Sequence, residues 1–460
     1  MLADDDAYSV LRSRDGRFDG RFFVAVVTTG VYCRPSCPAA LPKRENVRFY
    51  PSSAAALEAG FRACKRCRPD TTPGSPEWDV RADVAGRAMR LIADGLVDRE
   101  GVAGLAARLG YSERQLRRQL VADLGAGPQA LARAQRAANA RTLLETTDLP
   151  AGEIAFAAGF ATIRQFNDTL RQVYGTTPTA LRGSRHTRRS PGTLCLRLTY
   201  RPPLEAARLF GFLAARAVPG LEEAGDGRYR RVLALPHGLG VVALRPAHGY
   251  VSCELRLEDL KDLSAAVGRC RRLLDLDADP RDVADRLGRD PVLGPVVAAA
   301  PGLRVPGHVD PAEMAVRAIA REETAGGRAL LAGLVQRYGT PLSAPVDGLT
   351  HAFPRMEVLA EADVPAPVAA LAEAVSAGRL DLGFGAGREQ AGRELLAVPG
   401  VDAEVAGRVR LRALGDPDVF LPSDPAVRDG LSRLGLTVED ARRWRPWRSY
   451  AMSHLTAIRP

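Results

Sequence analysis

The chain has 460 residues, with 64 lysines and arginines against 54 aspartates and glutamates, and seven cysteines. This length predicts three or four domains, and a hydrophobic fraction of 46% with a charged fraction of 26% excludes wholesale disorder. No run approaches the roughly 18 apolar residues of a membrane span, since the best candidate, 292–303, is broken by Pro295 and Pro301. An acidic N-terminus without an apolar signal core and an odd cysteine count favour a reducing, cytoplasmic location over secretion.

The excess positive charge lies almost entirely in the first part of the chain. Residues 1–192 carry 29 basic and 20 acidic side chains, whereas residues 193–460 carry 35 and 34. Because clustered basic side chains bind phosphates, a nucleic-acid partner is expected chiefly for residues 1–192.

Patterning along the chain predicts a multidomain α+β protein. Residues 1–75 contain four clustered cysteines and end in the turn-rich segment TTPGSP. Residues 80–182 have a helical pattern and are followed by the basic stretch GSRHTRRSPG (183–192), a predicted linker. From residue 193 the pattern changes to short strands, which are TLCLRLTY, YRRVLALP, GLGVVALRP and YVSCELRL. From about residue 280 the chain is helical again.

Residues 80–182 contain an internal repeat. LAARLGYSERQLRRQLVADLG (105–125) is echoed by IAFAAGFATIRQFNDTLRQVYG (154–175), and the glycines Gly110 and Gly159 stand 49 residues apart. Each glycine is followed by a helix-starting pair, Ser112 with Gln115 and Thr162 with Gln165. The pattern predicts two helix-turn-helix units joined by a long helix over about 129–146.

The cysteines near the N-terminus form two closely spaced pairs, Cys33 with Cys37 and Cys64 with Cys67. Two such pairs brought together by a fold make a tetrahedral four-thiolate zinc site. Two interpretations are open: a closed structural zinc, or a site in which a solvent-facing thiolate remains nucleophilic. Basic residues surround the cysteines in sequence and favour the second, namely Arg34, Lys43, Arg44, Arg62, Lys65, Arg66 and Arg68.

TTGVYCRPSCPA, RENVRFY and AAGFRACKRCRPD resemble the N-terminal domain of the Ada-type adaptive-response regulators over about residues 8–70. The resemblance implies that Cys33 accepts a methyl group from methylphosphotriesters in DNA, and that Cys37, Cys64 and Cys67 complete the zinc site with it. Four basic residues are then candidates for DNA contacts, namely Arg34, Arg44, Arg62 and Lys65.

A charge-based switch follows as a hypothesis. Zinc with four thiolates has a net charge of about −2, and methylation of one sulfur leaves about −1. Because a less anionic site repels DNA phosphates less, methylation is expected to strengthen DNA binding.

The segment VYGTTPTALR resembles the end of the AraC-type DNA-binding domain, and residues 80–182 match that domain throughout. The resemblance implies an all-α double helix-turn-helix whose two second helices enter neighbouring major grooves of promoter DNA. It also implies RNA polymerase as a partner. The candidate DNA contacts are Arg114, Arg117 and Arg118 in the first unit and Arg164, Asn167 and Arg171 in the second.

The remainder of the chain, 193–460, resembles the AlkA-type DNA glycosylases that excise alkylated bases. The matching segments are LFGFLAARAVPGLEE, CRRLLDLDADP, PGLRVPGHVDP, RALGDPDVFLPSDPAV and RWRPWRSYAMSHL. The resemblance implies a mixed α/β domain over 193–278 and an all-α helix-hairpin-helix core over 279–460. It makes Asp424 the catalytic carboxylate, which stabilises the oxocarbenium charge on the sugar or positions the attacking water. No lysine follows Lys261, so strand cleavage through a Schiff base is not expected.

This half departs from its family at several positions. In the hairpin PGVDAEVAGRVRLRALG (399–415), Asp402 replaces a glycine and Glu404 a tryptophan, while Arg408 takes another aromatic position. The segment 320–327 replaces the family's DNA-entering G-Q-x-V-S, and Thr456 replaces a further aromatic residue. Carboxylates oppose an approaching phosphate, and Asp402 lacks the backbone freedom of glycine. Two interpretations are therefore open, a monofunctional hydrolytic glycosylase and a degenerate module that only binds DNA or supports the structure.

Overall fold

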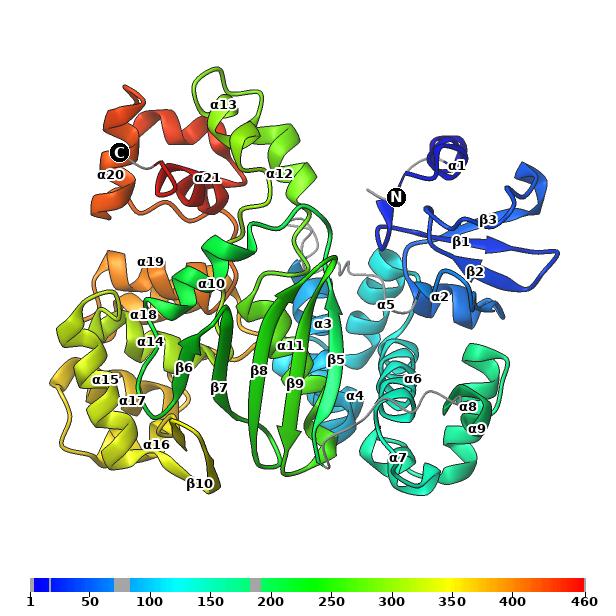
Figure 1. Cartoon of the computed structure of the whole chain (residues 1–460), viewed down its shortest axis with the longest axis horizontal. Helices are drawn as coiled ribbons and strands as arrows, with labels where there is room; N and C mark the ends of the chain where they lie inside the picture. Colours follow the sequence, from blue (N-terminus) through cyan, green and yellow to red (C-terminus); the bar gives the residue numbers. More distant parts are fainter. Residues whose placement is uncertain (1–3, 16–17, 70–82, 183–191, 459–460) are drawn as a thin grey trace. The chain divides into compact units, whose positions relative to one another are not determined.

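The computed structural model of the chain describes residues 4–15, 18–69, 83–182 and 192–458 (Figure 1). Both predicted linkers, TTPGSP and GSRHTRRSPG, lie outside these residues apart from Gly192. The chain forms two compact units. The first comprises Met1–Tyr200, Pro236–Gly238 and Glu254–Gly268, and the second comprises Arg201–Leu235, Leu239–Cys253 and Arg269–Pro460.

The cysteine-bearing part of the first unit is a small four-stranded sheet with the strand order β3-β1-β2-β4. Its elements are α1 (Asp4–Ser13), β1 (Phe23–Val26), β2 (Val31–Cys33), η2 (Arg44–Asn46), β3 (Val47–Tyr50), α2 (Ser53–Glu58) and β4 (Arg62–Ala63). Strand β1 is antiparallel to β2 and β3, and α1 covers the sheet through Ala7 and Leu11. Strands β2 and β4 are parallel, with Tyr32 opposite Ala63, so both strands deliver a cysteine at the same end.

Residues 83–182 are all helical and confirm the predicted repeat. The helices are α3 (Asp83–Ala93), α4 (Leu96–Leu109), α5 (Glu113–Leu124), α6 (Pro128–Thr146), α7 (Ala151–Ala157), α8 (Ile163–Tyr174) and α9 (Pro178–Arg182). Gly110 and Gly159 have φ values of 79° and 87°, which require glycine's freedom between the two helices of each unit. The long helix α6 packs against α4 and α5 on one side and α7 and α8 on the other, and so holds the two units together.

The capping pairs are also confirmed. Ser112 and Gln115 form a complete capping box at the start of α5, with each side chain accepting from the other's backbone N–H. At α8 the Thr162 hydroxyl accepts from the Gln165 N–H, while the Gln165 side chain reaches the N–H of Ala161 instead. Both second helices therefore begin where the sequence predicts.

The four predicted strands of the mixed region are present, together with a fifth that was not predicted. The elements are β5 (Leu194–Thr199), α10 (Ala206–Ala214), β6 (Glu222–Gly225), β7 (Arg228–Ala234), β8 (Leu239–Ala247), β9 (Tyr250–Leu257), η5 (Leu260–Asp262) and α11 (Leu263–Leu273). The strands form one sheet in the order β5-β9-β8-β7-β6. Strand β6 was missed because its sequence, EEAG, has no apolar alternation, and pairing with β7 through Glu222 opposite Arg231 defines it.

The C-terminal part is mainly helical. Its elements are α12 (Pro280–Leu287), α13 (Leu293–Ala299), α14 (Pro311–Ala320), α15 (Ala325–Tyr338), β10 (Thr340–Val346), β11 (Leu349–Ala352), α16 (Met356–Glu361), α17 (Ala366–Ser376), α18 (Arg388–Leu396), α19 (Ala403–Arg412), α20 (Pro425–Arg433), η6 (Glu439–Trp444) and α21 (Arg448–Leu455). The antiparallel hairpin β10–β11 interrupts the helices that were expected throughout. An Asp-Gly pair at 347–348 forms its turn, a hairpin signal that the helical expectation overlooked.

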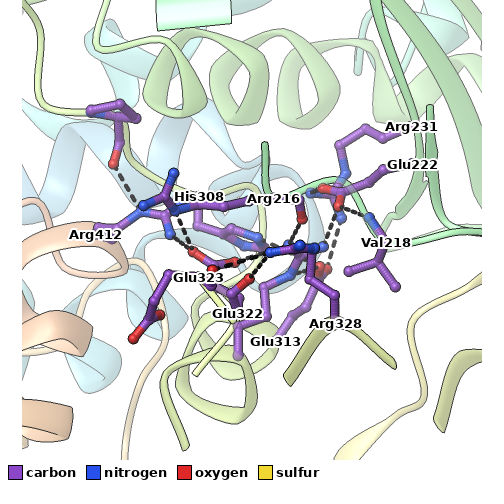
Figure 2. A network of polar contacts seen from close by, with 12 residues as sticks. Arg216, Val218, Glu222, Arg231, His308, Glu313, Glu322, Glu323, Arg328 and Arg412 are labelled. Carbon is purple, nitrogen blue, oxygen red and sulfur yellow. Dashed lines mark hydrogen bonds and ion pairs between the residues drawn. The ribbon is translucent and has the colours of Figure 1, made fainter. Parts of the chain in front are cut away.

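A buried ion-pair network joins sheet and helices of the second unit (Figure 2). Arg231 on β7 contacts Glu222 at 3.0 Å and Glu313 at 2.8 Å, and Arg317 on α14 contacts the same two carboxylates at 2.6 and 2.8 Å. Arg317 also contacts Glu322, at 3.0 Å. These groups are almost fully buried, so each charge needs its partner, and loss of one partner would leave an uncompensated buried charge.

The network continues onto helix α19. Glu322 is ion-paired with Arg412 of α19 and lies 3.7 Å from Arg216, and the charges around it lower its pKa to about 2 against the effect of burial. The network thus fixes α19, the second helix of the hairpin, against α14 and the sheet.

No helix among the described residues combines the length and the hydropathy needed to cross a membrane.

Candidate zinc site, DNA-binding helices and glycosylase site

The structure brings all four predicted zinc ligands together. The sulfur atoms of Cys33, Cys37, Cys64 and Cys67 all lie within 4.8 Å of one another. A tetrahedron of thiolates with Zn–S bonds of about 2.3 Å has edges of about 3.8 Å, so the four sulfurs fit zinc after only small shifts. Zinc is the cofactor of this chain.

Local backbone geometry explains how the cysteines converge. The Cys64 N–H donates to the Tyr32 carbonyl at 3.0 Å, which continues the β2–β4 pairing, and the Cys37 N–H donates to the Arg34 carbonyl at 3.1 Å across a tight turn. Asp19 fixes that turn, because its carboxylate accepts from the N–H and the hydroxyl of Ser36 at 2.9 and 2.5 Å. Sequence reasoning missed Asp19, which lies 14 residues before the first cysteine and belongs to no recognisable pattern.

The thiols affect one another's ionisation. A hydrogen bond from Cys33 lowers the pKa of Cys67 to about 6, and the same bond, followed by burial, raises the pKa of Cys33. Burial raises the pKa of Cys37 to about 11. In the protein without metal, one sulfur is therefore ionised at the expense of the others, whereas a bound dication favours thiolate at every position.

Exposure differs among the four cysteines. Cys33, Cys37 and Cys67 are buried, and Cys33 is only 6% exposed, whereas Cys64 is partly exposed. Exposure alone would make Cys64 the accessible sulfur, while the family motif points to Cys33.

The four basic residues predicted to contact DNA near the zinc site have different environments. Arg44 is held internally, since it pairs with Asp4 and Asp5 of α1 and lies over the ring of Phe49. Arg34 lies 3.5 Å from Asp19 and is 36% exposed. Arg62 and Lys65 are exposed, so of the four they are the most available to a phosphate.

The zinc-binding part contacts the ends of both second helices. The Ser52 hydroxyl donates to the Leu124 carbonyl at the end of α5 at 2.7 Å. A Cβ added to Gly125, which ends α5, would lie 3.0 Å from Pro51, and one added to Gly175, which ends α8, would lie 2.9 Å from Arg62. The site and the DNA-binding helices are therefore packed into one structural unit.

An ion pair formed by Arg68, the residue after Cys67, strengthens the contact between the zinc-binding part and the DNA-binding helices. Arg68 contacts Glu145 of α6 at 2.9 Å, and the other oxygen of Glu145 contacts Arg141 at 2.9 Å. Sequence spacing carries no sign of this pairing, because the two partners lie 77 residues apart.

The predicted DNA-contacting residues of the repeat lie on α5 and α8. All of them are exposed except Asn167, which is half-buried; they are Arg114, Arg117 and Arg118 on α5 and Arg164, Asn167 and Arg171 on α8. Arg164 is 92% exposed and lies 3.8 Å from Asp168. The opposite face of each helix is buried through Leu116 and Leu120 or through Phe166 and Leu170. Each helix thus presents a polar, mainly basic face to solvent.

Asp424 of the second unit caps helix α20. Its Oδ1 accepts from the Ala426 N–H at 2.9 Å, while its Oδ2 lies 3.2 Å from the Arg408 guanidinium. The side chain is 25% exposed, so the carboxylate is reachable from solvent. A capping role and a catalytic role are compatible, because the cap uses only one of the two oxygens.

The hairpin between α18 and α19 corrects one expectation from the sequence. Asp402 has φ −91° and ψ 177°, an extended conformation that does not require glycine, so the concern about backbone freedom was wrong at this position. Gly400, with φ 83°, keeps the freedom that the turn requires.

The electrostatic concern about Asp402 is supported by the same geometry. Its carboxylate accepts from the Val405 N–H at 2.8 Å and caps α19. The helix terminus that would face a phosphate is therefore already occupied by a negative side chain.

Most of the other residues that differ from the family at the hairpin and in segment 320–327 lie together around Arg408. Arg408 contacts Glu404 at 2.9 Å, Glu323 at 3.2 Å and Asp424 at 3.2 Å. In the sequence these residues are separate departures from the family pattern. Only the fold shows that Arg408 contacts all of the others. Thr456, by contrast, is exposed at the end of α21.

Comparison with known proteins identifies each part of the chain. Three family models match: the metal binding domain of Ada over residues 6–70, a helix-turn-helix domain over 105–184 and the AlkA N-terminal domain over 195–310.

Three relatives show how these parts occur in nature. A probable bifunctional transcriptional activator/DNA repair enzyme AlkA of Mycobacterium tuberculosis is 54% identical over 97% of this chain and 95% of its own length. DNA-3-methyladenine glycosylase 2 of Escherichia coli is 35% identical over 56% of this chain and 95% of its own length. The bifunctional transcriptional activator/DNA repair enzyme Ada of Escherichia coli is 38% identical over 31% of this chain and 39% of its own length. The chain therefore belongs to the family of bifunctional transcriptional activators and DNA repair enzymes that join an Ada-type zinc domain and a helix-turn-helix domain to an AlkA-type glycosylase.

Proposed function

We propose that the first unit detects alkylated DNA by accepting a methyl group on Cys33 and then activates transcription. The observation that carries this proposal is the four-sulfur cluster packed into one unit with two solvent-facing basic helices. Exposed Arg62 and Lys65 beside the cluster supply positive charge for the phosphate backbone that contains the lesion.

The methyl transfer is a direct displacement. The Cys33 sulfur attacks the methyl carbon of the phosphotriester, an S–C bond forms, and the C–O bond breaks. The restored phosphodiester leaves as an anion, so no proton is transferred. Bound zinc keeps the cysteine sulfurs as thiolates at neutral pH. Asp19 and the turn that it fixes hold the Cys33–Cys37 segment in place.

Peptide mapping tests the identity of the acceptor. The full-length protein is incubated with duplex DNA that carries isotope-labelled methylphosphotriesters, digested and analysed by tandem mass spectrometry. We expect one label per protein, on Cys33. A label on the more exposed Cys64 would overturn the assignment, and no label on any cysteine would leave a plain zinc-containing regulator.

Promoter binding is assigned to α5 and α8, with Arg114, Arg117 and Arg118 on the first helix and Arg164, Asn167 and Arg171 on the second. The expected partners are promoter DNA and RNA polymerase in the cytoplasm. Methylation is expected to tighten binding because it removes one negative charge near the DNA. Equal promoter affinity of methylated and unmethylated protein, measured at several salt concentrations, would exclude the charge-based switch.

We further propose that the second unit hydrolyses the glycosidic bond of alkylated bases, with Asp424 as the catalytic carboxylate. The supporting observation is that the Asp424 side chain is 25% exposed beside the hairpin, and that the helix cap uses only its Oδ1 while its Oδ2 faces Arg408. As the C1′–N bond breaks, a cationic base leaves as a neutral molecule, and the carboxylate stabilises the positive charge left on the sugar. Water then adds to C1′ and gives up a proton.

Release of free base from methylated duplex DNA tests this second activity. Wild type is expected to release base, and Asp424→Asn to release at least about 100-fold less, the scale of losing one preorganised charge in an active site. Asp429→Asn on the same helix is the matched control and should remain active, since Asp429 is exposed and, among the residues that the structure describes, is ion-paired with Arg433 alone. Absence of release from wild type itself would favour the degenerate module.

A further inference from the structure

Three residues around Asp424 differ from the family at their positions, and one of them, Arg408, contacts the other two. Glu404 stands where the family has tryptophan, Arg408 stands at another aromatic position, and Glu323 belongs to the replaced segment 320–327. Independent decay of a site would leave charges without partners. Here each of the three is ion-paired, and the centre of the cluster is the guanidinium that also contacts Asp424.

The contacts use the whole guanidinium group. Its Nη1 contacts Glu323 at 3.2 Å, its Nη2 contacts both Glu404 at 2.9 Å and Asp424 at 3.2 Å, and its Nε donates to Glu404 at 3.2 Å. The side chain of Arg408 is 19% exposed, and its three partners are 25–30% exposed. The cluster is therefore half-buried at the surface where Asp424 is accessible.

The backbone beneath the cluster is held rigidly. Arg412, one turn after Arg408 on α19, is ion-paired with Glu322, the residue immediately before Glu323. Two arginines of α19 thus engage two consecutive carboxylates, one pair in the buried network and one pair at the surface (Figure 2 shows the buried side). Packing fixes Glu323 and Arg408 where they are, which a specificity determinant requires.

We propose that Glu323, Glu404 and Arg408 determine the substrate range of the glycosylase half and restrict it to bases that carry a formal positive charge. This inference rests on the glycosylase activity proposed above. Aromatic rings attract cationic bases but also stack on neutral ones, whereas the cluster offers a neutral base no stacking surface. Three carboxylates face the Arg408 guanidinium, and the neighbouring Glu322 is shared by Arg216 and Arg412. Four negative charges therefore stand against three positive ones, and the excess negative charge attracts a cation that enters the site. A neutral lesion finds neither that attraction nor a ring at position 404 or 408.

Paired substrates separate charge selection from general activity. Two duplexes are identical except for one lesion, 7-methylguanine, which is cationic, or hypoxanthine, which is neutral. Single-turnover release is measured for the full-length protein, and each rate is divided by that of the uncatalysed reaction. Wild type, Glu404→Gln, Glu323→Gln and the exposed control Glu357→Gln on α16 are compared.

We expect each cluster variant to slow release of 7-methylguanine about tenfold, as loss of one nearby charge should, and to leave release of hypoxanthine unchanged. The control should change neither rate. An equal decrease for both bases would mean that the residues only support the structure, and the inference would fail while the activity stands. Efficient release of hypoxanthine by wild type would also overturn it.

A second variant guards against misfolding. Glu404→Trp combined with Arg408→Tyr replaces the charged pair by rings and should raise release of hypoxanthine at least about tenfold over wild type, because aromatic rings stack on neutral bases as well as on cationic ones. No gain with this variant, in protein with an unchanged unfolding temperature, would count against charge selection. If wild type releases neither base, the glycosylase function itself fails, which is distinct from either result above.

Discussion

Asp402 is predicted to weaken DNA binding by the hairpin. Its carboxylate repels a phosphate and also occupies the Val405 N–H, and two substitutions separate these two effects. Asp402→Asn removes the negative charge but keeps the cap on the Val405 N–H, because asparagine caps helices as well as aspartate does. Asp402→Gly removes the charge and also frees that N–H for a phosphate.

The magnitude follows from the charge. For a phosphate about 5 Å away, Coulomb repulsion by one carboxylate is between about 0.8 kcal/mol in water and about 3 kcal/mol at an effective dielectric constant near 20. At about 1.4 kcal/mol for each factor of ten, relief of this repulsion strengthens binding by about 4-fold to 200-fold. Loss of the cap in the glycine variant costs only a few tenths of a kcal/mol, so both variants should fold.

The assay is single-turnover base release over a range of protein concentrations, with 7-methylguanine duplex as the substrate. Both variants should lower the half-saturating protein concentration and leave the maximal rate unchanged, since Asp402 does not touch the reacting atoms. The glycine variant should show the steeper dependence on salt, because it adds a phosphate contact. An unchanged or higher half-saturating concentration in Asp402→Asn would refute the electrostatic reasoning.

Three further predictions concern stability and signalling. Glu145→Gln, which removes the partner of Arg68, should destabilise the first unit by about 1 kcal/mol with unchanged zinc content; an unchanged unfolding temperature would contradict it. Ser112→Ala breaks the capping box of α5 and should cost about 1 kcal/mol and weaken promoter binding, read by calorimetry and fluorescence anisotropy. Burial raises the pKa of Asp275 from 3.8 to about 7, so the folded protein keeps a proton that the unfolded chain releases, and stability falls as pH rises from about 4 to about 7. The stability of Asp275→Asn relative to wild type should therefore increase between pH 5 and about 7 by up to about 3 kcal/mol, and a difference that does not depend on pH would exclude this cause.

Much of the fold could be predicted because local signals agreed with the tertiary structure. The capping pair Ser112 and Gln115 and the glycine turns at Gly110 and Gly159 are local devices, and the structure uses them as the sequence indicates. The cysteine spacing also predicted a convergent site. In the structure, the parallel pairing of β2 with β4 brings the two cysteine pairs together. The missed elements, β6 and the β10–β11 hairpin, lack the apolar alternation on which strand prediction depends.

The electrostatic partnerships could not be predicted, because they join residues far apart in the sequence. Arg44 was expected to face DNA, yet α1 places Asp4 and Asp5 against it. Glu404 and Arg408 were interpreted as damage to an aromatic site, and only the fold shows that they share one cluster with Glu323. A charge count along the chain gives the sign of a region but not which charges neutralise each other.

The zinc-binding part contacts the ends of both α5 and α8, and this limits how the promoters that the protein binds can evolve. A helix-turn-helix pair held only by α6 could tolerate an inserted base pair between its two sub-sites by bending that helix. Here Ser52 and Pro51 rest against the end of α5, and Arg62 rests against the end of α8. With promoter binding by α5 and α8 as proposed above, the spacing between the two sub-sites is tied to the zinc-binding part. An operator with altered spacing would require compensating changes in the zinc domain, so damage sensing and promoter architecture are constrained to change together.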